Sequence, residues 1–283
     1  MKKYCFVIDV AKCENCNNCF LSCKDEHCGN DWPGYSQAQP LHGHRWMNIL
    51  TRERGAFPFV DVAYLPKPCG HCDDAPCLRA AADGAVHKRA DGIVLIDPVK
   101  AKGRKTLVGA CPYGVIWWNE TLQLPQKCTF CAHLLDGGWH QPRCVQSCPT
   151  GALSILHATD EELAGIVQAE GLEVLDSGST ATRPRCYYKN LYRFTGDCIV
   201  GSVAATVGDI TECVIGANVS LHEGSKSLGE RVTDEFGDFK FDRLPTGVAD
   251  YELTIAHGDR QATRLKVSKK ESLSLGTIWI EEL

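Results

Sequence analysis

The chain has 283 residues, a formal net charge of -5 and 17 cysteines. This length allows two domains of ordinary size, and the acidic balance gives no electrostatic reason to expect a nucleic-acid partner. Neither an export signal nor an apolar run that could span a bilayer is evident, so we expect a cytoplasmic protein whose cysteines bind metal or carry out redox chemistry rather than form disulfides.

The cysteines fall into four groups before residue 149, and their spacing is the main signal in the sequence. The first group has the spacing C-x2-C-x2-C-x3-C, and the second has C-x2-C-x4-C. A lone cysteine followed by proline comes third, and the fourth group has C-x2-C-x12-C-x3-C, again followed by proline. In chain order the candidate ligands are Cys13, Cys16, Cys19, Cys23, Cys69, Cys72, Cys77, Cys111, Cys128, Cys131, Cys144 and Cys148.

The spacing of the first group favours iron–sulfur clusters over zinc. A zinc ribbon uses two C-x2-C pairs and has no need of further cysteines at the positions of Cys19 and Cys23. In bacterial ferredoxins the same spacing lets three thiolates hold one cluster while the fourth reaches a neighbouring cluster. Iron–sulfur clusters are therefore predicted, and a zinc-binding scaffold is the weaker alternative. The other cysteines fit no such spacing and are predicted to be buried apolar side chains: Cys5, Cys28, Cys186, Cys198 and Cys213.

Regular elements are predicted between and after these groups. Short strands are expected over residues 5–13 and 91–98, and Thr159 with Glu162 forms a capping box that starts a helix. The aromatic run at 187–194 is interpreted either as a strand or arm packed on its own domain or as an arm on a partner subunit. Segments of alternating polarity then recur between turns, which predicts a small antiparallel β-sandwich or barrel.

The cysteine pattern resembles that of the iron–sulfur (beta) subunits of molybdopterin oxidoreductases of the dimethyl sulfoxide reductase, nitrate reductase and formate dehydrogenase type. The stretches WPGY, HRWMNI, DGIVLIDP and YYKNLYRF extend this resemblance to a phenol-acting branch of the family. The C-terminal region resembles carboxypeptidase-regulatory-like repeats. The implied fold is α+β, with a double bacterial-ferredoxin-like core over 1–158, a helix and connecting arm over 159–197, and a carboxypeptidase-regulatory-like or prealbumin-like β domain over 198–283.

The resemblance also implies how the cysteines share clusters, because in this family the first group pairs with the fourth and the second with the third. The implied ligand sets are Cys13, Cys16, Cys19 and Cys148; Cys23, Cys128, Cys131 and Cys144; and Cys69, Cys72, Cys77 and Cys111. A fourth cluster would need cysteines at positions that hold Ala81, Ala101, Arg104 and Leu107. All the missing ligands belong to that one site, so three [4Fe-4S] clusters are expected.

By the same resemblance, the protein would be an electron-transfer subunit without a catalytic site of its own. Its partner would be a large subunit that holds a bis-pterin molybdenum cofactor and acts on phenolic substrates by hydroxyl transfer or hydroxylation. A membrane subunit is not expected, because relatives with four clusters pass electrons to it through the site that this protein lacks. Two alternatives stay open: a subunit of another molybdopterin reductase or dehydrogenase, and clusters with a mainly structural role, since hydroxyl transfer moves no net electrons.

Overall fold

The computed structural model describes residues 1–81, 83–176, 178, 182–258 and 262–280. The chain divides into two compact units, each built from two separate stretches of sequence. The first unit consists of Met1–Leu50 and Tyr64–Leu191, and the second consists of Thr51–Ala63 and Tyr192–Leu283. Within the described ranges, no helix combines the length and the apolar character needed to cross a membrane.

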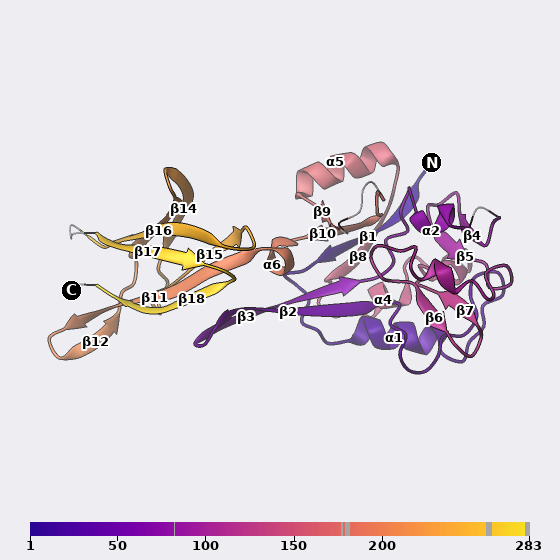
Figure 1. Ribbon diagram of the computed structural model, residues 1–283, viewed down its shortest axis with the longest axis horizontal. Helices are drawn as coiled ribbons and strands as arrows, with labels where there is room; N and C mark the ends of the chain where they lie inside the picture. Colours follow the sequence, from indigo (N-terminus) through magenta and orange to yellow (C-terminus); the bar gives the residue numbers. More distant parts are fainter. Residues whose placement is uncertain (82, 177, 179–181, 259–261, 281–283) are drawn as a thin grey trace. The chain divides into compact units, whose positions relative to one another are not determined.

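A four-stranded sheet in the order β8-β1-β10-β9 forms part of the first unit (Figure 1). Its strands are β1 (Lys3–Asp9), β8 (Leu153–Ala158), β9 (Glu173–Val174) and β10 (Cys186–Lys189). β1 lies antiparallel to β8 and parallel to β10. Phe6 and Ile8 share one face of β1 and Cys5 lies on the other, and all three are fully buried, as expected for a strand covered on both faces. The strand predicted over 5–13 is confirmed but ends at Asp9.

Helix α5 (Asp160–Glu170) follows β8 and begins where the sequence predicts. The hydroxyl of Thr159 accepts a hydrogen bond from the Glu162 amide at 3.2 Å, and the Glu162 carboxylate accepts one from the Thr159 amide at 2.8 Å. These two bonds satisfy amides that would otherwise lack partners in the first turn. Leu163 packs this helix against Cys5 of β1.

The aromatic run begins in β10, where it packs within the first unit; its interpretation as an arm on a partner subunit stays a prediction. Tyr188 is almost fully buried, and its hydroxyl donates a hydrogen bond to the Pro66 carbonyl at 3.2 Å. The run continues into the short helix α6 (Tyr192–Thr195).

Short elements carry the cysteine groups of the first unit. β4 pairs with β5 and β6 with β7, so each pair forms a small antiparallel ladder. The predicted strand in 91–98 is confirmed as β5. In chain order these elements are α1 (Asn18–His27), α2 (Pro76–Arg79), β4 (Val86–Lys88), β5 (Val94–Ile96), the 3-10 helix η1 (Lys105–Leu107), β6 (Trp117–Asn119), β7 (Leu124–Gln126), α3 (Ala132–Asp136) and α4 (Arg143–Gln146).

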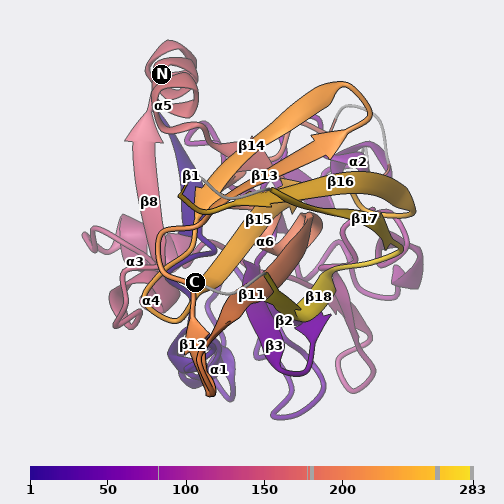
Figure 2. The ribbon, with the colours of Figure 1, turned by 90° about the vertical axis from the view of Figure 1, so that its left-hand side faces the viewer.

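Two four-stranded sheets form most of the second unit (Figure 2). One has the order β12-β11-β15 with β18 on the other edge of β11, and the other has the order β14-β13-β16-β17. The strands are β11 (Asp197–Val207), β12 (Ile210–Cys213), β13 (Asn218–Glu223), β14 (Lys226–Val232), β15 (Asp238–Leu244), β16 (Ala249–Ala256), β17 (Thr263–Lys269) and β18 (Leu273–Trp279). Their pairings are antiparallel except that of β11 with β18, which is parallel and was not predicted.

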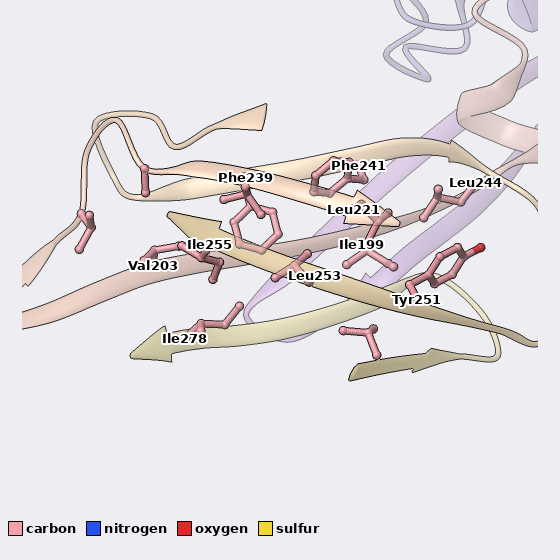
Figure 3. Packing of buried hydrophobic residues seen from close by; sticks show 14 of the residues in the cluster. Ile199, Val203, Leu221, Phe239, Phe241, Leu244, Tyr251, Leu253, Ile255 and Ile278 are labelled. Carbon is pink, nitrogen blue, oxygen red and sulfur yellow. The ribbon is translucent and has the colours of Figure 1, made fainter. Parts of the chain in front are cut away.

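One hydrophobic core lies between these two sheets (Figure 3). Leu221 and Leu253 come from one sheet, Ile199 and Phe241 come from the other, and all four are buried at 1% exposure or less. Alternate residues of strands such as β13 and β16 enter this core, which is the packing of a two-layer β structure.

A hairpin of β2 (Asn48–Ala56) and β3 (Phe59–Lys67) was not predicted from the sequence. Its tip, Thr51–Ala63, belongs to the second unit. There the guanidinium of Arg54 is fully buried and pairs with Asp61 and, at 2.7 Å, with Asp242. Arg52 donates to Asp197 at 2.6 Å. Ionic contacts therefore join the hairpin tip to the β strands of this unit.

Candidate metal centres

Four cysteines from two groups border one small cavity in the first unit. Cys69 and Cys72 lie in the loop before α2 and Cys77 lies in α2, whereas Cys111 lies in the loop after η1. Apolar side chains such as Val94 and Ile116 complete much of the wall. Within the described part of the sequence, no three His, Cys, Asp or Glu side chains converge on a position for a single metal ion. Four thiols around one hollow match the ligand set of a [4Fe-4S] cluster.

The electrostatics of these thiols also fit a metal centre. Burial raises the pKa of Cys72 to about 12, and the neighbouring Cys69, Cys111 and Cys77 contribute to the increase. Four thiolates this close together would repel one another in an apolar environment. Bound iron removes this penalty, because a coordinating thiol is deprotonated and its charge is compensated by the metal.

The second set combines three cysteines of the first group with one cysteine of the fourth group. Burial raises the pKa of Cys19 to about 12, and among its neighbours Cys13 and Cys148 raise it further, followed by Cys16. The loop that carries the first of these cysteines turns at Asn15, with φ 55°, and at Asn17, with φ 61°. Asparagine tolerates this left-handed conformation better than most residues. The four thiols are Cys13, Cys16, Cys19 and Cys148.

The third set is the most deeply buried. Burial raises the pKa of Cys131 to about 12 and that of Cys144 well above its usual value, with Cys131, Cys128 and Cys23 contributing to the shift of Cys144. Cys23 comes from α1 and Cys144 from α4, two helices in contact. The set consists of Cys23, Cys128, Cys131 and Cys144, all at 9% exposure or less.

The two C-x2-C loops of the second and fourth groups have the same local structure. The amide of His71 donates to the Cys69 sulfur and the amide of Phe130 donates to the Cys128 sulfur, each at 3.4 Å. His71 and Phe130 both have positive φ, at 43° and 59°. This backbone turn directs an N–H group at a thiol, and hydrogen bonds to cluster sulfurs tune reduction potential.

Two pairs of these sets lie close together. Cys19 of the set with Cys148 contributes to the pKa of Cys144, and Cys69 contributes to the pKa of Cys128. The set that contains Cys144 and Cys128 therefore lies near both other sets.

Four positions at which the family resemblance would place the cysteines of a fourth cluster hold other residues. Ala81, Ala101 and Leu107 are buried at 2% exposure or less in one hydrophobic cluster that also includes Cys72 and Cys77. Arg104 instead forms an ion pair with Asp83 at the surface. These residues supply apolar contacts and a surface charge pair, and none of them can ligate iron.

The remaining cysteines differ in environment. Cys5, Cys186 and Cys198 are buried, as predicted, and Cys28 is half-buried. The prediction is wrong for Cys213, which is exposed because it ends β12, an edge strand whose residues are all exposed.

Sequence reasoning missed Lys127, which directly precedes the C-x2-C pair of the fourth group. It is only 3% exposed and borders the same cavity as Cys69 and Cys111. The feature of the sequence that could have indicated Lys127 is its positive charge directly before the candidate ligand Cys128.

Comparison with known proteins identifies relatives over the whole sequence. Residues 60–158 match the family model of the 4Fe-4S dicluster domain. The chain is 48% identical over 281 residues to the pyrogallol hydroxytransferase small subunit of Pelobacter acidigallici, covering 98% of this chain and 99% of that protein. It is 31% identical over 194 residues to the arsenate respiratory reductase iron–sulfur subunit of Shewanella sp. (strain ANA-3), covering 52% and 78%. It is 33% identical over 165 residues to the B subunit of the anaerobic dimethyl sulfoxide reductase of Escherichia coli, covering 53% and 72%.

Proposed function

Since this protein belongs to the iron–sulfur subunits of dimethyl sulfoxide reductase-family molybdoenzymes, we propose that each of its three cysteine sets holds one [4Fe-4S] cluster. The observation that carries this proposal is the cavity shared by Cys69, Cys72, Cys77 and Cys111. It unites cysteines from two groups in the combination that the family pairing requires. The other two sets likewise combine cysteines from the first and fourth groups.

The protein is an electron-transfer subunit, and when bound the clusters accept and release single electrons. Its own residues hold and insulate them. The thiols supply the ligands, the amides of His71 and Phe130 donate to ligand sulfurs, and apolar side chains line the cavity of Cys69. The proposed fold is the double ferredoxin-like core over 1–158, with an arm over 159–197 and a prealbumin-like β domain over 198–283.

The proposed partner is a large catalytic subunit with a bis-pterin molybdenum cofactor, in a stable one-to-one complex. The relative named as a pyrogallol hydroxytransferase small subunit supports a phenolic substrate and hydroxyl transfer. We propose no catalytic residue in this protein. The cytoplasmic location remains a prediction.

The proposed complex contains no membrane subunit. The positions of the family's fourth cluster are filled by Ala81, Ala101 and Leu107 and by the surface residue Arg104. The cluster proposed for Cys72 and Cys77 therefore adjoins apolar side chains at these positions.

Iron and acid-labile sulfide analysis of the purified complex tests the cluster number. Three sites of four irons each give twelve irons, with electron paramagnetic resonance signals of cubane clusters on reduction. Eight or sixteen irons would contradict the proposal, and stoichiometric zinc would favour the scaffold alternative.

The second candidate function is a structural role for the clusters, which is favoured by the absence of net electron transfer in hydroxyl exchange. Rapid freezing during turnover separates the two. Clusters that change oxidation state on the timescale of catalysis transfer electrons, whereas clusters that stay in one state throughout turnover brace the subunit.

A further inference from the structure

Lys127 is a cation in the interior of the metal-binding unit. The residue is 3% exposed, and it links β7 to the loop of Cys128 and Cys131. An ammonium group is rarely buried this deeply without a partner, because desolvation of a charge is costly. The position therefore calls for an explanation beyond packing.

Its hydrogen bonds all go to the walls of the metal sites. The ammonium group donates to the main-chain carbonyls of Val94 and Cys128. It also borders the cavity that Cys69 lines. Cys69 belongs to one thiol set and Cys128 to the next, so Lys127 lies where the two sets adjoin.

No carboxylate neutralises this charge among the residues that the structure describes. Lys88 provides a contrast in the same unit. It also donates to the loop carbonyls of His71 and Cys72, at 3.1 and 2.8 Å, but it pairs with Asp73 at 3.0 Å and its side chain is 20% exposed. The charge of Lys88 is thus compensated and partly screened by water.

We propose that Lys127 acts as a fixed positive charge between two clusters and raises their reduction potentials. Reduction adds one electron to a cluster, and its extra negative charge is stabilised by a nearby cation in a low-dielectric interior. No proton needs to move, since the electron arrives from a neighbouring cluster or donor. The effect should be largest for the cluster of Cys69, whose cavity Lys127 borders, and should extend to the cluster of Cys128.

This inference rests on the proposed ligand sets, so the experiment begins with the iron content of the wild-type complex. Twelve irons support the ligand sets independently of any property of Lys127. The same complex is then prepared with Lys127→Met, Lys127→Gln, Lys127→Arg and the matched control Lys88→Met. Redox titration followed by electron paramagnetic resonance gives the potential of each cluster.

The neutral variants should make at least one cluster tenfold harder to reduce, which corresponds to a potential lower by about 59 mV for one electron. Lys127→Arg keeps the charge and should stay close to the wild type. Lys88→Met removes a cation that contacts the same loop, but Arg185 still pairs with Asp73 at 2.9 Å, so its shift should be smaller.

Three results would overturn the proposal. One is a full set of irons with unchanged potentials in Lys127→Met and Lys127→Gln, which would show that the charge has no electrostatic role. Another is loss of clusters in both neutral variants, which would show that Lys127 is needed to assemble the sites and does not serve to set their potentials. The third is an equal shift in Lys88→Met, which would show that the position of Lys127 is not specific.

Discussion

Cys111 borders the same cavity as Cys77, although two strands and a 3-10 helix separate them in the sequence. The loop after η1 brings Cys111 there, while the positions between them that would hold another cluster's ligands form apolar contacts. A single cysteine without neighbouring cysteines thus completes a set begun far upstream.

Replacement of this cysteine should therefore damage a cluster whose other ligands lie upstream. In Cys111→Ser, the oxygen is a harder ligand than a thiolate, so the cluster of Cys69, Cys72 and Cys77 should become labile or lose iron. The iron content should fall from twelve towards eight, with the signals of the other two clusters unchanged. Iron analysis and electron paramagnetic resonance measure this result, and Cys213→Ser, at an exposed cysteine outside every set, serves as the control. Full iron content in Cys111→Ser would contradict the pairing.

Arg104→Ala should leave all clusters in place, because this residue pairs with Asp83 at the surface and not with a ligand. An exposed ion pair contributes up to about 1 kcal/mol, so the free energy of unfolding should change little. Iron analysis and thermal unfolding check both statements. Iron loss in this variant would mean that Arg104 supports a metal site that its contacts do not show.

Leu107→Ala should have a larger effect on stability. Leu107 is 2% exposed and packs in the same hydrophobic cluster as Cys77. Truncation of a buried leucine costs about 2–5 kcal/mol through lost burial and the cavity that remains. Chemical denaturation measures this cost, and iron release from the neighbouring cluster should become faster. The exposed Leu41→Ala is the control, and similar stability for both variants would contradict the burial of Leu107.

Asp197→Asn should destabilise the second unit. The carboxylate is 1% exposed and accepts from Lys269 and Arg52 at 2.7 and 2.6 Å. The substitution leaves the buried ammonium of Lys269 without its counter-ion, which typically costs about 3–5 kcal/mol. Denaturation of the complex with a probe in the second unit measures this cost. An unchanged free energy of unfolding would show that the pair contributes nothing net.

The same pair predicts a pH dependence. Burial opposes ionisation of Asp197, but Lys269 and Arg52 outweigh it and lower the pKa of the carboxyl. The stabilisation is complete above the unfolded pKa of about 3.9 and is lost as pH falls through the lower folded value. The stability difference between the wild type and Asp197→Asn should therefore be constant near neutral pH and shrink in acid. A difference that grows as pH falls below about 4 would contradict this sign.

Local chemistry explains what could be predicted from the sequence alone. The cysteine spacing indicated iron–sulfur sites because thiolates in one loop can share a cluster only at short, regular intervals. The capping box of Thr159 and the alternating strands of the second unit were readable for the same reason, since their partners lie within a few residues. The pairing of groups came from family resemblance and not from spacing.

Contacts between distant residues decided the rest. The hairpin tip at 51–63 joins the second unit because Arg52 and Arg54 meet carboxylates far along the sequence, at Asp197 and Asp242. The sequence of the tip does not indicate which carboxylates these two arginines meet. The parallel pairing of β18 with β11 also joins residues far apart in the sequence, such as Ile199 and Leu273. In the sequence, Lys127 looks like an ordinary polar residue. Its burial near two thiol sets depends on residues that only the tertiary structure brings together.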